Sequence, residues 1–360
     1  MTSRLGTLTK LPPDPHHVLD PWVGQRSATF RFELVNGVTG ELLGEIHPLR
    51  TASLTHDTTR TIKRSLNLEL GAVDTAAINT VTDRVDVYMV FHQEEPHEHP
   101  MGRYMFVDSA RQVFTSGKLA NVALTDEMFM VDQELSAGVS GVGSPVTSVI
   151  TKVLANTDQP VSYTLEASPY ASVEAWPAGT SRGRVLESLA LSGDYFGPWF
   201  GNDKKMHFIR SFDPAKQLPD FDFDAGAQVN RYSITETDDL LSAPNRFIVI
   251  SNAATDSSIP AVGVADVVTT APHSIANRGF VIAQTLDLQV TDGAQAQAVA
   301  NNVMLRQTIF ERVSLSTAPD PRHDSYNVIR WQGKLWLELG WTMTMVEGGE
   351  MSHILRRAYT

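Results

Sequence analysis

Three histidines and three glutamates crowd the eight residues from 92 to 99, and both side-chain types are ligands of zinc and nickel. The candidate ligands are His92, Glu94, Glu95, His97, Glu98 and His99. Their spacing differs from the HExxH pattern, in which a helix turns two histidines to one face. Pro96 and Pro100 instead predict a solvated, irregular loop between two strands. We therefore expect this loop to hold no specific metal ion.

Aspartate alternates with phenylalanine over residues 220–224, which resembles the start of a calcium loop. An EF-hand loop needs glycine at its sixth position and glutamate at its twelfth. This chain has Ala225 and Arg231 at those positions, so the calcium interpretation fails. The alternation instead predicts an amphipathic strand that turns Phe221 and Phe223 inward and leaves the carboxylates in water.

The sequence lacks the patterns that activate a nucleophile. It has no cysteine, no GxSxG elbow, and no glycine-rich phosphate loop with its lysine. His16 and His17, and the neighbours His273 and Ser274, suit structural roles better than a catalytic triad. We therefore predict that the protein is not an enzyme and carries no cofactor.

An excess of acid narrows the function classes further. The 360 residues include 41 Asp and Glu against 29 Lys and Arg, a formal net charge of −12. Proteins that grip nucleic acid need clustered Lys and Arg, so nucleic acid is a poor main partner. The absence of cysteine excludes disulfides and cysteine zinc sites. No segment approaches 18 apolar residues and no apolar signal core begins the chain, so we expect neither a membrane span nor an export signal.

The sequence of residues 1–131 predicts an extended arm followed by a series of short strands. Prolines crowd the N-terminal segment, and residues 1–27 are expected to run as an extended arm. Short alternating strands follow, beginning with a hairpin at Asn36-Gly37. Their spacing predicts a small β-barrel or sandwich over residues 28–131.

Helical periodicity marks the middle segment, residues 132–224. Apolar residues recur at helix spacing over 146–155, with Ser144 as the expected N-cap and Pro145 at the first helical position. A second helix is expected to end near Gly193, with that glycine in the left-handed conformation. An aromatic hairpin follows, so this segment is predicted to be an α+β domain.

Residues 225–360 return to strands, interrupted by an amphipathic helix over 292–307 with Asp292 as its N-cap. The last hairpin turns at Gln332-Gly333. In its second strand the apolar residues take one face, and Glu338 takes the other with two threonines. The predicted fold is therefore β-rich α+β, with two small β-barrel domains interleaved with an α+β domain.

Three stretches of the chain resemble minor tail proteins of long-tailed phages that infect actinobacteria. The first runs from His56 to Leu68 and continues through NTVTDRVD and MGRYMF. The second covers Trp176–Phe212. The third extends over parts of 238–279, Asp320-Pro-Arg-His-Asp324 and the closing strand as far as Met351. Together they span about residues 50–355.

The family is similar to the central hub of the phage baseplate. The resemblance implies a trimer whose six similar barrels cap the end of a hexameric tail tube, at the tip of the virion tail. The implied partners are the distal tail protein, the tape-measure protein and other tail-tip proteins, with genomic DNA passing through transiently. An acidic channel wall would let DNA slide without sticking, which fits the net charge of −12.

Two alternatives stay open at the level of sequence. A distal tail protein is also β-rich but forms a hexameric ring, so copy number separates it from a hub. A cell-wall-hydrolysing or sugar-binding tail component would need paired carboxylates or an exposed aromatic platform. Trp199 and Phe200 are the candidate platform, although core packing suits them better.

Overall fold

The computed structural model describes most of the chain beyond the N-terminal segment. The described residues are 28–50, 52–71, 78–92, 97–114, 117–224, 229–236, 243–251, 260–307 and 311–358. The expected arm over 1–27 and the candidate ligands Glu94 and Glu95 lie outside them. None of the described helices is both long enough and apolar enough to cross a membrane.

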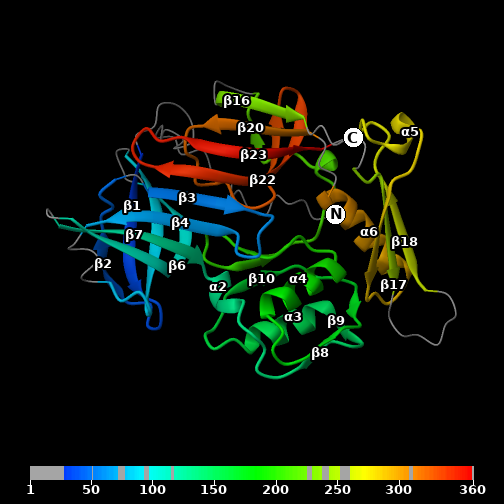
Figure 1. Ribbon diagram of the computed structural model, residues 1–360, viewed down its shortest axis with the longest axis horizontal. Coiled ribbons are helices and arrows are strands. Elements are labelled where there is room, and N and C mark those ends of the chain that lie inside the picture. The colour runs from blue at the N-terminus through cyan, green and yellow to red at the C-terminus, as the bar shows by residue number, and fades with distance from the viewer. Residues whose placement is uncertain are drawn as a thin grey trace, which may run out of the picture.

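One large sheet of thirteen described strands dominates the molecule (Figure 1). Its first seven strands are β1 (Ala28–Asn36), β2 (Leu42–Ile46), β3 (Ala52–Asp57), β4 (Arg64–Leu70), β5 (Asp83–Phe91), β6 (His97–Phe114) and β7 (Gly117–Asp126). The other six are β15 (Phe221–Asp222), β16 (Val229–Glu236), β20 (Glu311–Thr317), β21 (Val328–Trp331), β22 (Lys334–Met345) and β23 (Met351–Arg357). The path runs β16-β20-β23-β22-β3-β4-β7-β6-β5-β1-β2, with β21 beside β22 and β15 beside β21. The hairpins predicted at Asn36-Gly37 and Gln332-Gly333 are confirmed as β1–β2 and β21–β22.

The first and last groups of strands join where β22 pairs with β3, from Gly340 opposite Asp57 to Met345 opposite Ala52. Trp341 and Met343 therefore pack in the same core as residues of β1–β7. The β-rich class is confirmed. The two expected barrels are instead joined in one open sheet, because β16 and β2 end the path and do not pair with each other among the described strands. The division at 28–131, 132–224 and 225–360 stays a prediction.

The middle segment packs its helices in a core of its own, below the large sheet in Figure 1. Its helices are α2 (Met128–Val131), α3 (Val146–Ala155), α4 (Arg182–Ser192) and the 3-10 turn η1 (Pro214–Lys216). Its short strands are β8 (Val139–Ser140), β9 (Ser144–Pro145), β10 (Tyr163–Leu165), β11 (Ala171–Ser172), β12 (Ala175–Trp176), β13 (Trp199–Phe200) and β14 (Met206–Phe208). The predicted helix over 146–155 and the aromatic hairpin β13–β14 are confirmed.

The caps predicted for α3 and α4 are wrong. Pro145, not Ser144, is the N-cap of α3, because Ser144 pairs with Ser172 in a small sheet. Gly193 ends α4 with a right-handed φ of −83°, and the left-handed residue is Asp194. A close approach explains the glycine: a Cβ there would lie 2.6 Å from the ring of Tyr195.

A third layer forms a small separate sheet with one long helix against it, at the right of Figure 1. Its elements are β17 (Arg246–Ser251), β18 (Val262–Asp266), α5 (Ile275–Arg278), β19 (Ala283–Leu288) and α6 (Gly293–Gln307). Asp292 caps α6 as predicted, since its carboxylate accepts the Gln295 N–H at 2.9 Å. Gly263 lets α6 approach β18, where a Cβ would lie 2.2 Å from the Ala296 backbone.

Candidate functional site

The described part of the His92–His99 stretch forms no ligand cluster. His92 hydrogen-bonds Thr29 at 2.8 Å, and Glu98 pairs with Arg31 at 2.5 Å. Strand β6 begins at His97, so His97, Glu98 and His99 belong to a ladder with β5 rather than to the expected loop. Burial is the main cause that lowers the pKa of His99. Of the four described candidates, His97 and His99 therefore take one face of β6 and Glu98 the other, and His92 bonds to Thr29.

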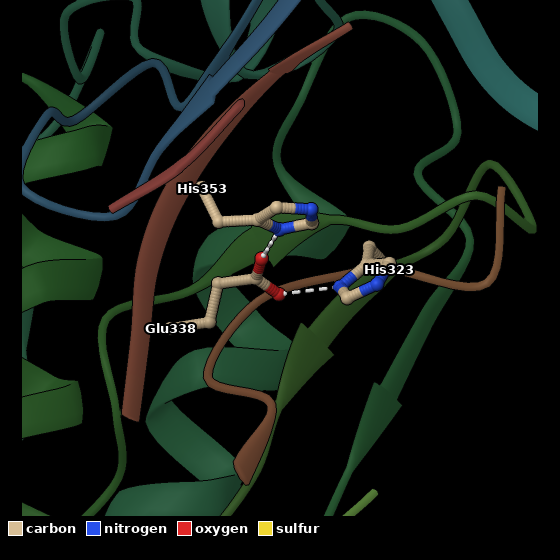
Figure 2. A group of neighbouring side chains, drawn as sticks. All are labelled: His323, Glu338 and His353. Carbon is tan, nitrogen blue, oxygen red and sulfur yellow. Dashed lines mark hydrogen bonds and ion pairs between the residues drawn. The ribbon is translucent and has the colours of Figure 1, made fainter. Parts of the chain in front are cut away.

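The structure instead brings together His323, Glu338 and His353, which form a closed group in Figure 2. Glu338 Oε2 accepts a hydrogen bond from His323 Nδ1 at 2.8 Å, and Glu338 Oε1 accepts one from His353 Nδ1 at 2.6 Å. The side chains of all three are at most 1% exposed. We call these three residues the buried triad. Among the described residues it is the one group whose ligand atoms could hold a metal ion.

The triad depends on a β-bulge in β22. The bulge lies between Glu338 and Gly340 and shifts the register against β23. Around it β22 is covered on both faces, because Trp336 packs in one core and Leu337 in another. Glu338 lies on the face opposite Leu337, as expected, but this face is also interior because Trp336 shares it. The bulge brings Trp341 to the same face as Glu338, so the expectation that the apolar residues of this strand all share one face is wrong. The buried carboxylate then requires partners, which the two imidazoles supply.

Aromatic rings enclose the triad. Phe221 stacks on His323 with ring centroids 3.8 Å apart and planes 8° apart, and Phe223 meets the His353 ring edge-on at 5.7 Å. These are the phenylalanines that the alternation over 220–224 predicted to face inward. The accompanying aspartates are not simply in water: Asp220 accepts the Val328 N–H and Asp222 pairs with Arg330.

Charge within the triad favours an ionised glutamate. Burial by itself raises the pKa of Glu338, but the two histidines outweigh it and hold the pKa below its ordinary value. Burial also lowers the pKa of His353, against the opposing effect of the Glu338 carboxylate. On its other side His353 Nε2 hydrogen-bonds Thr317 Oγ1 at 2.8 Å. Every hydrogen-bonding atom of Glu338 and His353 thus has a partner.

Two imidazole nitrogens and a carboxylate are a ligand set that Zn²⁺ accepts. Ligand atoms around a tetrahedral Zn²⁺ lie about 3.3 Å apart, given bonds of about 2.0–2.1 Å. Here the nitrogen and oxygen atoms are 2.6 and 2.8 Å apart, so both hydrogen bonds would have to open to admit a metal. The cavities lined by residues of α4 and of α6 do not include the triad. With side chains at most 1% exposed, the triad forms a hydrogen-bond network inside the fold.

A second polar network next to the triad joins three segments of the chain: β4, the β13–β14 hairpin and residues 320–324. The Asp324 carboxylate accepts hydrogen bonds from Arg64 Nη2 of β4 at 2.6 Å and from Trp199 Nε1 of β13 at 2.8 Å. Asn202 connects them further, since its Oδ1 accepts from Arg64 at 2.7 Å and its amide donates to Pro321 O. Segments far apart in sequence therefore converge on residues 320–324.

The described sugar-binding and catalytic-triad candidates from the sequence lie in the interior or cap a helix. Trp199 and Phe200 are each 4% exposed, so they provide no exposed sugar-binding platform. His273 is buried, and Ser274 caps α5 by accepting the Asn277 N–H. The buried triad has no local signal in the sequence, because its members come from three separate segments. The Asp-Pro-Arg-His-Asp run at 320–324 was the one sequence feature that could have indicated a polar network, since it places two acids, an arginine and a histidine within five residues.

No family model matches the sequence, and no curated protein matches it. Solved structures do match the fold. A tail protein from Neisseria meningitidis is 10% identical, with a TM-score of 0.63, 91% of this chain covered and 96% of that one. A 43 kDa prophage tail protein from Shewanella oneidensis is 8% identical, with a TM-score of 0.56 and 91% and 98% covered.

A prophage tail protein from Listeria monocytogenes is also 8% identical, with a TM-score of 0.57, 92% of this chain covered and 95% of that chain. The similarity extends over nearly the full length of each of these proteins, so it concerns the arrangement of all the layers rather than one domain. The chain therefore has the fold of these phage tail proteins.

Proposed function

We propose that the protein is a structural component of a phage tail tip, where three copies form a baseplate hub that caps the tail tube. The observation that carries this proposal is the fold match to prophage tail proteins, which covers over nine-tenths of both chains. In this function the buried triad and the Asp324 network hold the subunit rigid. Residues 28–131, 132–224 and 225–360 act as its three parts, and residues 1–27 as an arm toward a neighbouring protein.

Exposed apolar side chains support a role in assembly. Val262 and Val264 project from the outer face of β18 and are 48% and 40% exposed. Phe280 and Val281, just before β19 in the same small sheet, are 47% and 44% exposed. Val262 and Val264 lie on the same face of β18, and exposed apolar groups on one face favour burial against another protein. We assign this outer face of the small sheet to a subunit contact.

The excess of acidic residues supports a passage for DNA. A wall that carries negative charge repels phosphate and prevents adhesion, and the chain has a net charge of −12. The hub would then line part of the ejection channel. Contacts with the distal tail protein and the tape-measure protein belong to the same proposal.

Native mass spectrometry of the purified chain tests the assembly. The expected particle has three times the chain mass of 39.5 kDa. The double variant Val262→Lys, Val264→Lys should shift the particle toward monomer, since each contact would have to bury two ammonium groups without partners. The control Val81→Lys, at a turn residue that is 80% exposed, should keep the trimer.

A hexamer would favour the alternative, a distal tail ring. A trimer that persists in the β18 variant would leave the hub intact and overturn the assigned contact surface. A cell-wall-hydrolysing component is tested separately by incubating the protein with host cell wall, where the proposal expects no release of soluble fragments.

A further inference from the structure

A cavity of about 530 Å³ lies where the large sheet faces helix α4, and cations gather around it. Its charged lining residues are Arg60, Lys63, Arg184, Arg356 and Glu187. Arg60 is already paired with Asp57 at 3.1 Å, and Lys63 donates to the Arg60 carbonyl oxygen. With Arg60 paired, three cations remain against Glu187, so the pocket is electropositive in a chain whose net charge is −12.

Arg356 is the unusual member of this group. It is 4% exposed, and its Nε and Nη1 are buried without a hydrogen-bond partner. Its strand position explains where it lies: Arg356 is directly opposite Leu337 across β22 and β23, so both side chains project from the sheet face that packs against Phe196 and Tyr326. It lines the large pocket and also a smaller cavity beside α6.

A buried cation without a counter-ion is costly, because the low dielectric of the interior penalises an isolated charge. Burial lowers the pKa of Arg356 to about 10, and Arg312 adds repulsion in the same direction. No acid within the described part of the chain opposes these two effects on the pKa of Arg356. An anion from outside would remove this penalty.

The walls of the pocket indicate which anion fits. Leu191, Leu337 and Leu339 line it together with the Phe196 and Tyr326 rings. A bare inorganic anion would leave these apolar surfaces in contact with water. A carboxylate on a short hydrocarbon stem would place its oxygens near Arg356 and Lys63 and its methylenes against the apolar wall.

We propose that this pocket binds an organic carboxylate, supplied by a small organic acid or by an acidic side chain of a second copy of this chain. The acid excess of the chain makes a second copy a suitable source. This inference does not depend on the tail-tip function, because it concerns binding by the purified chain.

Glutarate is the probe, since it carries a carboxylate on a stem like that of a glutamate side chain. We expect glutarate to raise the melting temperature in a saturable way, with inorganic phosphate at equal ionic strength giving a smaller shift and chloride none. Arg356→Met should weaken glutarate binding at least about tenfold, which corresponds to about 1.4 kcal/mol. The control Arg330→Met, which removes a half-exposed arginine paired with Asp222 outside the pocket, should bind like the native chain.

Lys63 lines the same pocket from the connection between β3 and β4, and Lys63→Met should also weaken binding. The inference therefore stays testable if one variant fails to fold. No saturable shift with glutarate, or equal shifts in Arg356→Met and the native chain, would overturn it. Light scattering separates the two sources: glutarate lowers the particle mass if a second copy supplies the carboxylate, and leaves the mass unchanged if a free acid does.

Discussion

Glu338 and Arg356 lie on adjacent strands of one sheet, and both are buried, but among the described residues only Glu338 has side-chain partners that compensate its charge. Glu338 on β22 receives hydrogen bonds from His323 and His353. Arg356 on β23 faces the opposite side of the sheet and leaves two nitrogens without a partner. The difference teaches that a satisfied buried charge belongs to the architecture of the fold, whereas an unsatisfied one indicates a ligand or another subunit.

The largest effect is expected when the compensated charge is removed. Glu338→Leu leaves two buried imidazole N–H groups without an acceptor, and breaking such a buried group costs about 3–5 kcal/mol. The urea midpoint measures this loss. Glu41→Leu, at an exposed turn residue, is the matched control and should stay within about 0.5 kcal/mol. If the two variants lose equal stability, the hydrogen bonds from His323 and His353 to Glu338 do not stabilise the fold.

A smaller loss is expected at the Asp324 network. Arg64→Met removes a guanidinium that is 1% exposed and that donates to Asp324 and Asn202. Hydrogen bonds to charged groups are worth about 1.5–3 kcal/mol, so we expect a loss of about 2–3 kcal/mol in urea. Arg60→Met, an exposed arginine four residues earlier, serves as the control. An Arg64→Met loss below that of the control would contradict the convergence of three segments on residues 320–324.

The opposite sign is expected for Arg356. In chloride buffer without organic acid, Arg356→Met replaces an unpaired buried cation by an apolar side chain of similar length. Such replacements are often neutral or stabilising. We expect the free energy of unfolding, measured in urea, to rise by about 1 kcal/mol. A loss of more than about 2 kcal/mol would show that the native chain already neutralises this guanidinium.

The smallest effect concerns acid. Glu338 has a lowered pKa, so its stabilising contribution is present above the unfolded value of about 4.3 and disappears as the pH falls through the folded value. His353 also has a lowered pKa, so the unfolded chain binds its proton first and stability falls as the pH drops below about 6.5.

Both groups therefore make the native chain less stable at pH 4 than at pH 7. Melting temperatures across this range should fall less steeply in His353→Phe than in the native chain, because the variant loses the titrating imidazole and one of the groups that lower the pKa of Glu338. A steeper fall in the variant would reverse the assigned signs.

Local signals in the sequence were sufficient for several elements. Asn36-Gly37 specified its hairpin, and the apolar spacing of 146–155 specified α3. Asp292 capped α6 because an aspartate before a helical pattern satisfies the free N–H groups of the first turn. Each of these features depends on residues close together in the chain.

The triad and the joined sheet depend on contacts that no local pattern contains. The bulge after Glu338 changes which residues face inward, and β23, which carries His353, came after the last element that periodicity predicted. Pairing of β22 with β3 joins distant parts of the sequence, as the hydrogen bond between Thr55 and Thr342, 287 positions apart, illustrates. Such pairings are decided by packing of the whole chain.

A symmetry-averaged reconstruction of the tail tip of virions that contain this chain tests the hub most directly. The account predicts three copies around the axis, at the end of the tail tube, with the outer face of β18 in a subunit contact. Six copies in a ring above the tip would contradict it.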